Sequence, residues 1–432
     1  MPDLHDDLLR KAQSGDPEAQ YALGNAYQLG AGVARQLPVA MRWYLKAATQ
    51  GHRDAQVNLG LMFLQELPQA GVERNAAQAR YWFRRAAECG DAQAMFYLAR
   101  VLLDHGAPAD RADAVGWLER ACEAGHAPAC TELGVLFAAG EPGADPARAL
   151  AAYRRGAELG DMHAQFNLAN ALLLGDGTLA DQAQAAYWYR AAAEQGLVAA
   201  QYHLGLLLLA GESVPPDPAG GLDWLTRAAD QGMAAAQYEL ARQLRGAPGI
   251  EPDPLLVLHY LHEAADQAHV QAMFALALLL ERGEDLDRTY PEQAARWYRC
   301  LAREHGHGEA AHNLGILHVE GRGVERSAQS ATDMFQLAIA LGCNEAMYSL
   351  ALLHCAAGTP EDFQAAATWS ILSQEYCPER GGNVLLAGLA GRIDAARMES
   401  ARHAAQEWKR RMHTQDEAAG RDAQEESLAL NA

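Results

Sequence analysis

The chain has 432 residues and a formal net charge of −20, from 55 acidic and 35 basic side chains. This negative charge opposes binding to phosphate backbones and anionic membranes, so we expect no nucleic-acid partner. We find no segment apolar enough to span a bilayer, and residues 1–7 lack the basic start and apolar run of a secretory signal. We therefore expect a cytoplasmic protein with no membrane insertion.

The main feature of the chain is a repeat that covers residues 15–377, after a leading helix or partial repeat in residues 1–14. A ten-residue segment occurs ten times, and successive copies begin 35 to 39 residues apart. A fixed period of this length is typical of stacked two-helix units rather than of one globular core. The copies begin at Gly15, Gly51, Gly90, Gly125, Gly160, Gly196, Gly232, Ala268, Gly306 and Gly342.

The first helix of each repeat, helix A, is predicted by a leucine that has alanine four residues before it and glycine or alanine directly after it. The i, i+4 spacing places alanine and leucine on one helical face, and the small residue lets a second helix approach closely. A glycine such as Gly30 or Gly321 then ends helix A. The leucines are Leu23, Leu59, Leu98, Leu133, Leu168, Leu204, Leu240, Leu276, Leu314 and Leu350.

The second helix, helix B, has tryptophan at one position in seven copies and a small residue four positions later in most copies. We expect these tryptophans in the core, where truncating one should cost about 3–5 kcal/mol. The alternative is an exposed aromatic ladder that binds ligands. Leu301 breaks the small-residue rule, and we expect one inserted residue near the end of that helix. The tryptophans are Trp43, Trp82, Trp117, Trp188, Trp224, Trp297 and Trp369.

After the last repeat the pattern changes. Residues 378–413 predict capping helices, in which Ala401, Ala405 and Trp408 lie on one apolar face before a basic end. A solenoid needs such an element to cover its last apolar surface. Residues 414–432 are polar and acidic and contain no aromatic side chain, so we expect a disordered tail.

The first repeat reads Ala19-x-x-x-Leu23-Gly24-x-x-Tyr27, then Gly30-x-Gly32-Val33, then Ala40-x-x-Trp43-Tyr44-x-x-Ala47-Ala48-x-x-Gly51. This pattern resembles the Sel-one-like repeat family, relatives of the tetratricopeptide repeats. The resemblance implies an all-α fold, a right-handed α/α superhelical solenoid of about ten two-helix repeats with a C-terminal capping helix. It also implies a protein-interaction scaffold of a kind common in bacteria.

In tetratricopeptide-like stacks helix A lines the concave groove, so we expect the partner-binding residues one residue before and two residues after each repeated leucine. Asparagine offers a donor and an acceptor to a peptide backbone, and arginine can bind a carboxylate. The alternative is that these side chains only keep the groove polar. The candidates are Asn25, Asn58, Tyr97, Arg100, Asn167, Asn170, His203, Arg242 and Asn313.

We find no catalytic motif, and we expect a non-enzymatic adaptor that binds an unidentified protein or peptide and needs no cofactor and no metal. The alternative is a β-lactam or cell-wall amide hydrolase, as suggested for cysteine-rich relatives of the family. Those secreted relatives carry disulfides at the eight-residue spacing of Cys122 and Cys130. In a reducing cytoplasm we expect these two cysteines to be small buried packing residues instead.

A histidine group lies at the irregular junction before the ninth repeat. His305, His307 and His312 fall within eight residues, together with Glu304 and Glu309. Three histidines this close could bind one metal ion, but the spacing fits no zinc template. The favoured interpretation is a solvated turn between repeats.

Overall fold

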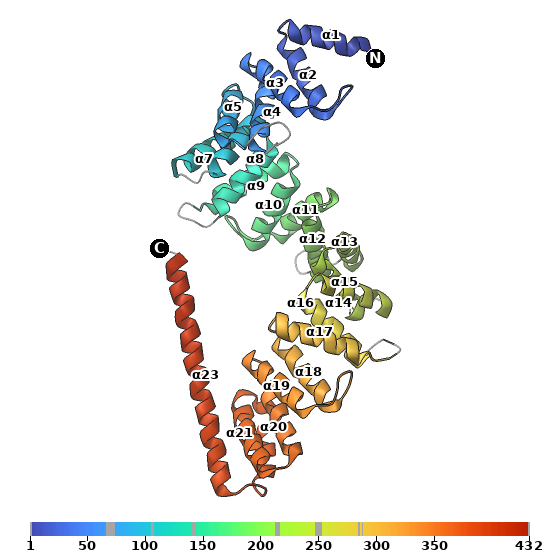
Figure 1. Ribbon diagram of the computed structural model, residues 1–432, viewed down its shortest axis with the longest axis vertical. Helices are drawn as coiled ribbons and strands as arrows, with labels where there is room; N and C mark the ends of the chain where they lie inside the picture. Colours follow the sequence, from blue (N-terminus) through green and yellow to red (C-terminus); the bar gives the residue numbers. More distant parts are fainter. Residues whose placement is uncertain are drawn as a thin grey trace. The chain divides into compact units, whose positions relative to one another are not determined.

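The structure is a computed structural model of the chain. It describes residues 2–65, 74–104, 108–139, 144–211, 217–246, 253–283, 286 and 288–430. Throughout these residues the regular elements are helices, and they alternate between the two helices of ten repeats. The predicted all-α solenoid of two-helix repeats is confirmed. Figure 1 shows the helices following one another along the chain, and from Pro2 to Ala210 and from Ala234 to Tyr376 each helix packs on the next.

The helix A elements are mostly 13 residues long. They are α2 (Pro17–Leu29), α4 (Arg53–Leu64), α6 (Ala92–Asp104), α8 (Ala127–Ala138), α10 (Met162–Leu174), α12 (Val198–Ala210), α14 (Ala234–Gly246), α16 (Val270–Arg282), α18 (Gly308–Glu320) and α20 (Glu345–Ala357).

The helix B elements alternate with them. They are α3 (Leu37–Thr49), α5 (Ala76–Glu88), α7 (Pro108–Glu123), α9 (Pro146–Glu158), α11 (Gln182–Glu194), α13 (Pro218–Asp230), α15 (Pro254–Asp266), α17 (Pro291–Glu304), α19 (Ala328–Ala340) and α21 (Pro360–Tyr376). Helix α1 (Pro2–Gln13) precedes them, and the 3₁₀ helix η2 (Pro378–Arg380), α22 (Gly382–Leu389) and α23 (Ala395–Leu430) follow. The chain divides into two compact units, residues 1–228 and 229–432, and we describe each by itself.

The buried residue of helix B is the one after the repeated tryptophan, and in four of these copies it is a ring. Tyr44, Phe83 and Tyr189 are fully shielded from solvent, whereas Trp43 and Trp188 are half-buried. The buried ring packs against the small residue after the leucine, since a Cβ on Gly24 would lie 2.6 Å from Cδ1 of Tyr44. The expectation that the tryptophans form the core is therefore wrong by one position in most repeats, although Trp82 is buried.

Three of the half-buried tryptophans, Trp43, Trp117 and Trp224, pair with cations three residues later on the same helix. Lys46 lies 4.2 Å from the ring centre of Trp43, and Arg120 lies 4.3 Å from that of Trp117. Such exposed cation–π pairs contribute about 0.5–1 kcal/mol each. These tryptophans therefore both pack against the buried core and pair with a cation at the helix surface.

Two local departures from the repeat lie in the eighth copy. Helix α17 has 14 residues where α15 has 13, which confirms the inserted residue near Leu301. Ala268 occupies the position where the other copies have glycine, and its φ is +60°. Among the described residues it is the only non-glycine with positive φ, a conformation that costs an L-residue about 1–2 kcal/mol.

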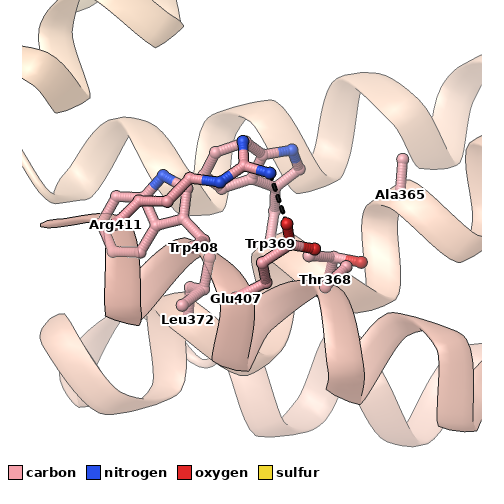
Figure 2. A pocket seen from close by; sticks show the side chains of 8 residues that line it. Ala365, Thr368, Trp369, Leu372, Glu407, Trp408 and Arg411 are labelled. Carbon is pink, nitrogen blue, oxygen red and sulfur yellow. Dashed lines mark hydrogen bonds and ion pairs between the residues drawn. The ribbon is translucent and has the colours of Figure 1, made fainter.

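The last repeat is covered by α23, which packs against α21. Trp408 of α23 meets Trp369 edge to face, with ring centres 6.2 Å apart, and Ala401 and Ala405 are buried beneath it. Figure 2 shows these rings beside the Glu407–Arg411 ion pair, around a pocket of about 270 Å³. The predicted apolar face of the capping helix is thus formed by the expected residues.

Helix α23 continues to Leu430, so the expectation of disorder from residue 414 differs from the structure. The segment is rich in alanine, glutamate, glutamine and arginine, which all have high helix propensity. A polar composition argues against a packed core, but it does not prevent a helix.

Candidate functional site

The candidate residues lie along the helix A elements, at the positions directly before and two after the repeated leucine; we call this set the polar stripe. Its asparagines, Tyr97 and His203 are half-buried, and Arg100 and Arg242 are exposed. The stripe residues belong to both units, and we describe those of each unit by themselves. What each can bind depends on its own neighbours.

In the first unit, buried tyrosines of helix B donate to stripe asparagines. The Tyr44 hydroxyl donates to Oδ1 of Asn25 at 2.6 Å, and the Tyr189 hydroxyl donates to Oδ1 of Asn170 at 2.5 Å. Burial raises the pKa of Tyr189 to about 12, so its hydroxyl keeps its proton and acts as a donor. These bonds use the carbonyl of the asparagine side chain and leave its amide nitrogen as the group for an external acceptor.

Asn167 and Asn170 of α10 line one pocket of about 350 Å³. Tyr153 and Leu150 of α9 form its apolar wall, and the exposed carboxylate of Asp176 lies at the end that follows α10. The pocket therefore combines amide groups, an apolar surface and one negative charge. It is the place where the structure brings two predicted stripe residues together.

In the second unit, Arg242 of α14 lines a pocket of about 270 Å³ with Tyr238, Arg245 and Leu261. The Arg242 guanidinium already donates to both carboxylate oxygens of Glu239, at 2.6 and 2.9 Å. Glu239 is buried, so this ion pair fixes the direction of the guanidinium. The predicted carboxylate partner of Arg242 is thus supplied by the same helix.

The remaining stripe residues contact neighbouring rings. Tyr97 stacks on Phe83 at 5.4 Å between ring centres. Arg100 lies 5.8 Å from the ring centre of Phe96. Burial lowers the pKa of His203, whose ring is nearly parallel to that of Tyr189 at 5.5 Å. The side chain of Asn58 is hydrogen-bonded to that of the buried Tyr44, and the side chain of Asn313 to that of the buried Tyr298.

Sequence analysis missed a set of buried glutamines that follow the repeated alanine of helix A. Each donates its Nε2 to a backbone carbonyl eight residues earlier, at the end of the preceding helix, over 3.0 to 3.3 Å. The recurring Ala-Gln dipeptide was the available signal. The glutamines are Gln20, Gln56, Gln165, Gln201 and Gln237.

Cys122 and Cys130 form a disulfide with Cα atoms 4.9 Å apart, so the expectation of two reduced packing cysteines is wrong. The turn between α7 and α8 brings the two sulfur atoms together. The sequence of the other repeats hides this proximity, because most have alanine at the position of Cys122 and glutamine or methionine at that of Cys130. The bond also matches the spacing in the cysteine-rich relatives.

The three histidines of the irregular junction have separate roles. His307 caps α18, where its Nδ1 accepts from the Ala310 amide at 3.2 Å and its ring stacks on Phe274. Nε2 of His312 lies 2.8 Å from the Ser349 hydroxyl. His305 lies beside Cys300 and Glu304 instead. The hypothesis that these histidines bind one ion together is therefore not supported by their positions.

Comparison with protein families gives ten matches to the Sel1 repeat. They cover residues 17–52, 53–91, 92–126, 127–161, 163–197, 198–233, 234–269, 270–305, 308–343 and 344–373. Comparison with curated protein sequences gives no match. In the part of the chain that the structure describes, no helix combines the length and apolar character of a membrane span.

Among solved structures, the chain is similar to c5321, a protective antigen of uropathogenic Escherichia coli with an SLR fold. The identity is 27%, the TM-score is 0.72, and the match covers 94% of this chain and 86% of that one. A Sel1 repeat protein from Oxalobacter formigenes matches at 24% identity and a TM-score of 0.49, over 79% of this chain and 88% of that one.

Proposed function

The chain belongs to the Sel1 repeat family, and we propose that it is a non-enzymatic scaffold that holds an extended segment of a partner protein along the polar stripe of its first unit. The observation that carries this proposal is the pocket of Asn167 and Asn170. The Tyr189 hydroxyl donates to the side-chain carbonyl of Asn170. This part-buried hydrogen bond orients the amide nitrogen of Asn170 before any partner binds. Preorganised donors lose little entropy on binding.

The chemistry of the pocket indicates what the partner segment should contain. The asparagine amides match backbone carbonyl groups of an extended chain. Leu150 and Tyr153 offer an apolar contact, and Asp176 favours a basic side chain. The net charge of −20 also favours a basic partner through long-range attraction.

Affinity capture from the source organism with matched variants tests this proposal. Asn167→Ala removes one amide, and Asn170→Asp keeps the acceptor for Tyr189 while removing the amide donor. Both should lose the partner that the parent protein captures, with an unchanged thermal midpoint. Arg154→Ala, at an exposed position of α9, is the control and should retain it. Equal capture by all the variants would refute the pocket assignment.

One observation favours the hydrolase alternative, namely the contact of the Ser349 hydroxyl with Nε2 of His312 at 2.8 Å. A serine beside a histidine is the minimal arrangement of an activated nucleophile. However, burial lowers the pKa of His312, and neither residue lines the nearby pocket of Gly308, Glu309 and Cys343. Turnover of a chromogenic β-lactam that disappears in Ser349→Ala would favour the hydrolase over the scaffold.

A further inference from the structure

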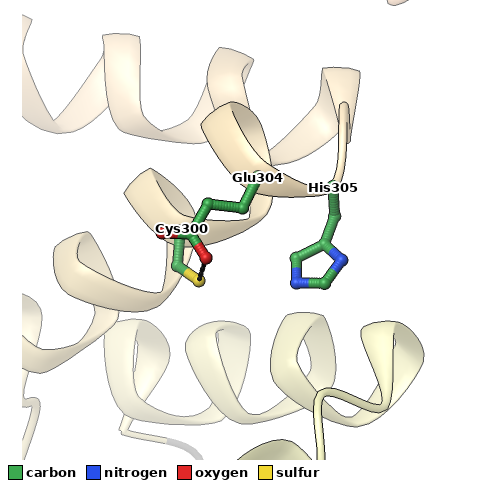
Figure 3. Close-up of side chains that lie close together, drawn as sticks. All are labelled: Cys300, Glu304 and His305. Atoms are coloured by element: carbon green, nitrogen blue, oxygen red, sulfur yellow. Dashed lines mark hydrogen bonds between the residues drawn. The ribbon is translucent and has the colours of Figure 1, made fainter.

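The end of α17 brings three different metal-binding side chains together. Cys300 and Glu304 are one helical turn apart, and the Cys300 thiol donates to Oε2 of Glu304 at 3.4 Å. The sulfur, a carboxylate oxygen and a ring nitrogen of His305 all lie within 4.8 Å of one another. Figure 3 shows the imidazole of His305 beside the Cys300–Glu304 pair.

The inserted residue of the eighth repeat accounts for this arrangement. Helix α17 has 14 residues, so it still includes Glu304 and places His305 at its C-cap. The backbone there is fixed, because the amides of His305 and His307 both donate to the carbonyl of Leu301, at 3.2 and 3.0 Å. The C-terminal end of a helix carries partial negative charge, which favours a bound cation.

The donor set defines the class of ion. Thiolate, imidazole and carboxylate are together typical of Zn²⁺ and of Co²⁺, its usual spectroscopic substitute, rather than of Mg²⁺ or Ca²⁺. Bonds of about 2.0–2.3 Å place neighbouring ligand atoms of a tetrahedral zinc site about 3.3–3.8 Å apart. Glu304 and His305 are exposed and Cys300 is half-buried, so small side-chain rotations reach this geometry without repacking the core.

We propose that Cys300, Glu304 and His305 bind one Zn²⁺-class cation, with a fourth coordination position open to water or to a partner's side chain. On binding, a metal–sulfur bond replaces the thiol hydrogen bond to Glu304, and the thiol proton leaves to solvent. This site is independent of the polar stripe and does not depend on the scaffold proposal.

Titration of the reduced, metal-stripped protein with Co²⁺ tests the proposal. We expect a thiolate-to-cobalt charge-transfer band in the near ultraviolet that saturates at one equivalent, with visible bands typical of four-coordinate cobalt. Cys300→Ser should abolish the charge-transfer band, and His305→Ala should weaken Co²⁺ binding by more than about tenfold. Cys89→Ser changes a different free cysteine, which is exposed, and should leave the titration unchanged.

Several outcomes would overturn the site. They are no charge-transfer band in the parent protein, a band that persists in Cys300→Ser, and a band that Cys89→Ser removes. Far-ultraviolet circular dichroism of each variant shows that the fold is retained. A second measurement uses Zn²⁺, which should raise the thermal midpoint of the parent protein but not that of His305→Ala.

Discussion

The fifth and eighth repeats solve the same packing problem with different chemistry. In both, a fully buried tyrosine of helix B, Tyr189 or Tyr298, directs its hydroxyl toward helix A. In the fifth repeat the acceptor is the neutral amide of Asn170, and in the eighth it is the carboxylate of Glu281, at 2.7 Å. Glu281 also accepts from Arg322 at 2.9 Å.

The comparison separates what stacking requires from what it leaves open. Other repeats stack without a ring, since Leu118 and Leu225 take its place. In the fifth and eighth repeats, stacking requires an acceptor for the buried tyrosine hydroxyl, because an unpaired buried hydroxyl is costly. It does not determine whether that acceptor is neutral or charged. The eighth repeat, which has the charged acceptor, also contains Ala268, the inserted residue and the proposed metal site. Local irregularity and new chemistry thus occur in the same repeat.

The largest expected effect is the loss of the buried ring. Tyr189→Ala and Tyr298→Ala should each destabilise their unit by about 3–5 kcal/mol in chemical denaturation followed by circular dichroism. Trp188→Ala, next to Tyr189, should cost clearly less because its ring is half-buried. Equal losses for Trp188 and Tyr189 would contradict the assignment of the core ring.

Removing only the hydroxyl tests the difference between the two acceptors. Tyr189→Phe should cost about 1 kcal/mol, whereas Tyr298→Phe should cost about 1.5–3 kcal/mol because its acceptor is ionised. The same denaturation experiment measures both values. If Glu281→Gln lowers the cost of Tyr298→Phe toward that of Tyr189→Phe, the charge is the cause. An unchanged cost would show that it is not.

Restoring the glycine removes one irregularity of the eighth repeat. Ala268→Gly should stabilise the second unit by about 1 kcal/mol, because φ is +60° at this position. Gly160→Ala, at the start of the fifth repeat where φ is +90°, should destabilise the first unit by a similar amount. Thermal midpoints of the two variants should therefore move in opposite directions.

The smallest expected effect is a dependence on pH through His203 of the sixth repeat, whose ring lies beside Tyr189 of the fifth. Burial lowers the pKa of His203 below its ordinary value of 6.5, so the unfolded chain takes up this proton first. Stability should then fall as the pH drops through 6.5 and be unaffected by His203 at higher pH. His203→Asn, which copies Asn313 beside Tyr298, should reduce the loss of stability measured between pH 7.5 and 5.5.

The period and the positions of alanine, leucine and small residues were sufficient to predict the fold. The core ring was misplaced because tryptophan and tyrosine are adjacent in the sequence, and neighbouring residues on a helix differ by about 100° in direction. The periodicity alone does not decide which of two adjacent rings faces inward. The contact between Gly24 and Tyr44 decides it.

The candidate site was predictable only in part. The stripe positions follow from helix geometry, but the bonds from Tyr44 and Tyr189 to stripe asparagines depend on how two helices are rotated against each other. The cluster of Cys300, Glu304 and His305 depends on the path of one turn. The sequence offered His305, His307 and His312 as a candidate metal-binding group because they are close together in the chain. In the structure, the inserted residue places Cys300 and Glu304 beside His305 instead.

The buried glutamines make neighbouring repeats thermodynamically dependent on one another. Each belongs to one repeat and bonds to the helix before it, so it contributes to a junction rather than to a repeat. Copies with Met95, Met273, Ala311 or Met347 at this position lack that amide. Junctions of unequal strength would let the array open in segments. At Cys130 the same eight-residue connection is the covalent bond to Cys122, which makes that junction the one that unfolding cannot separate.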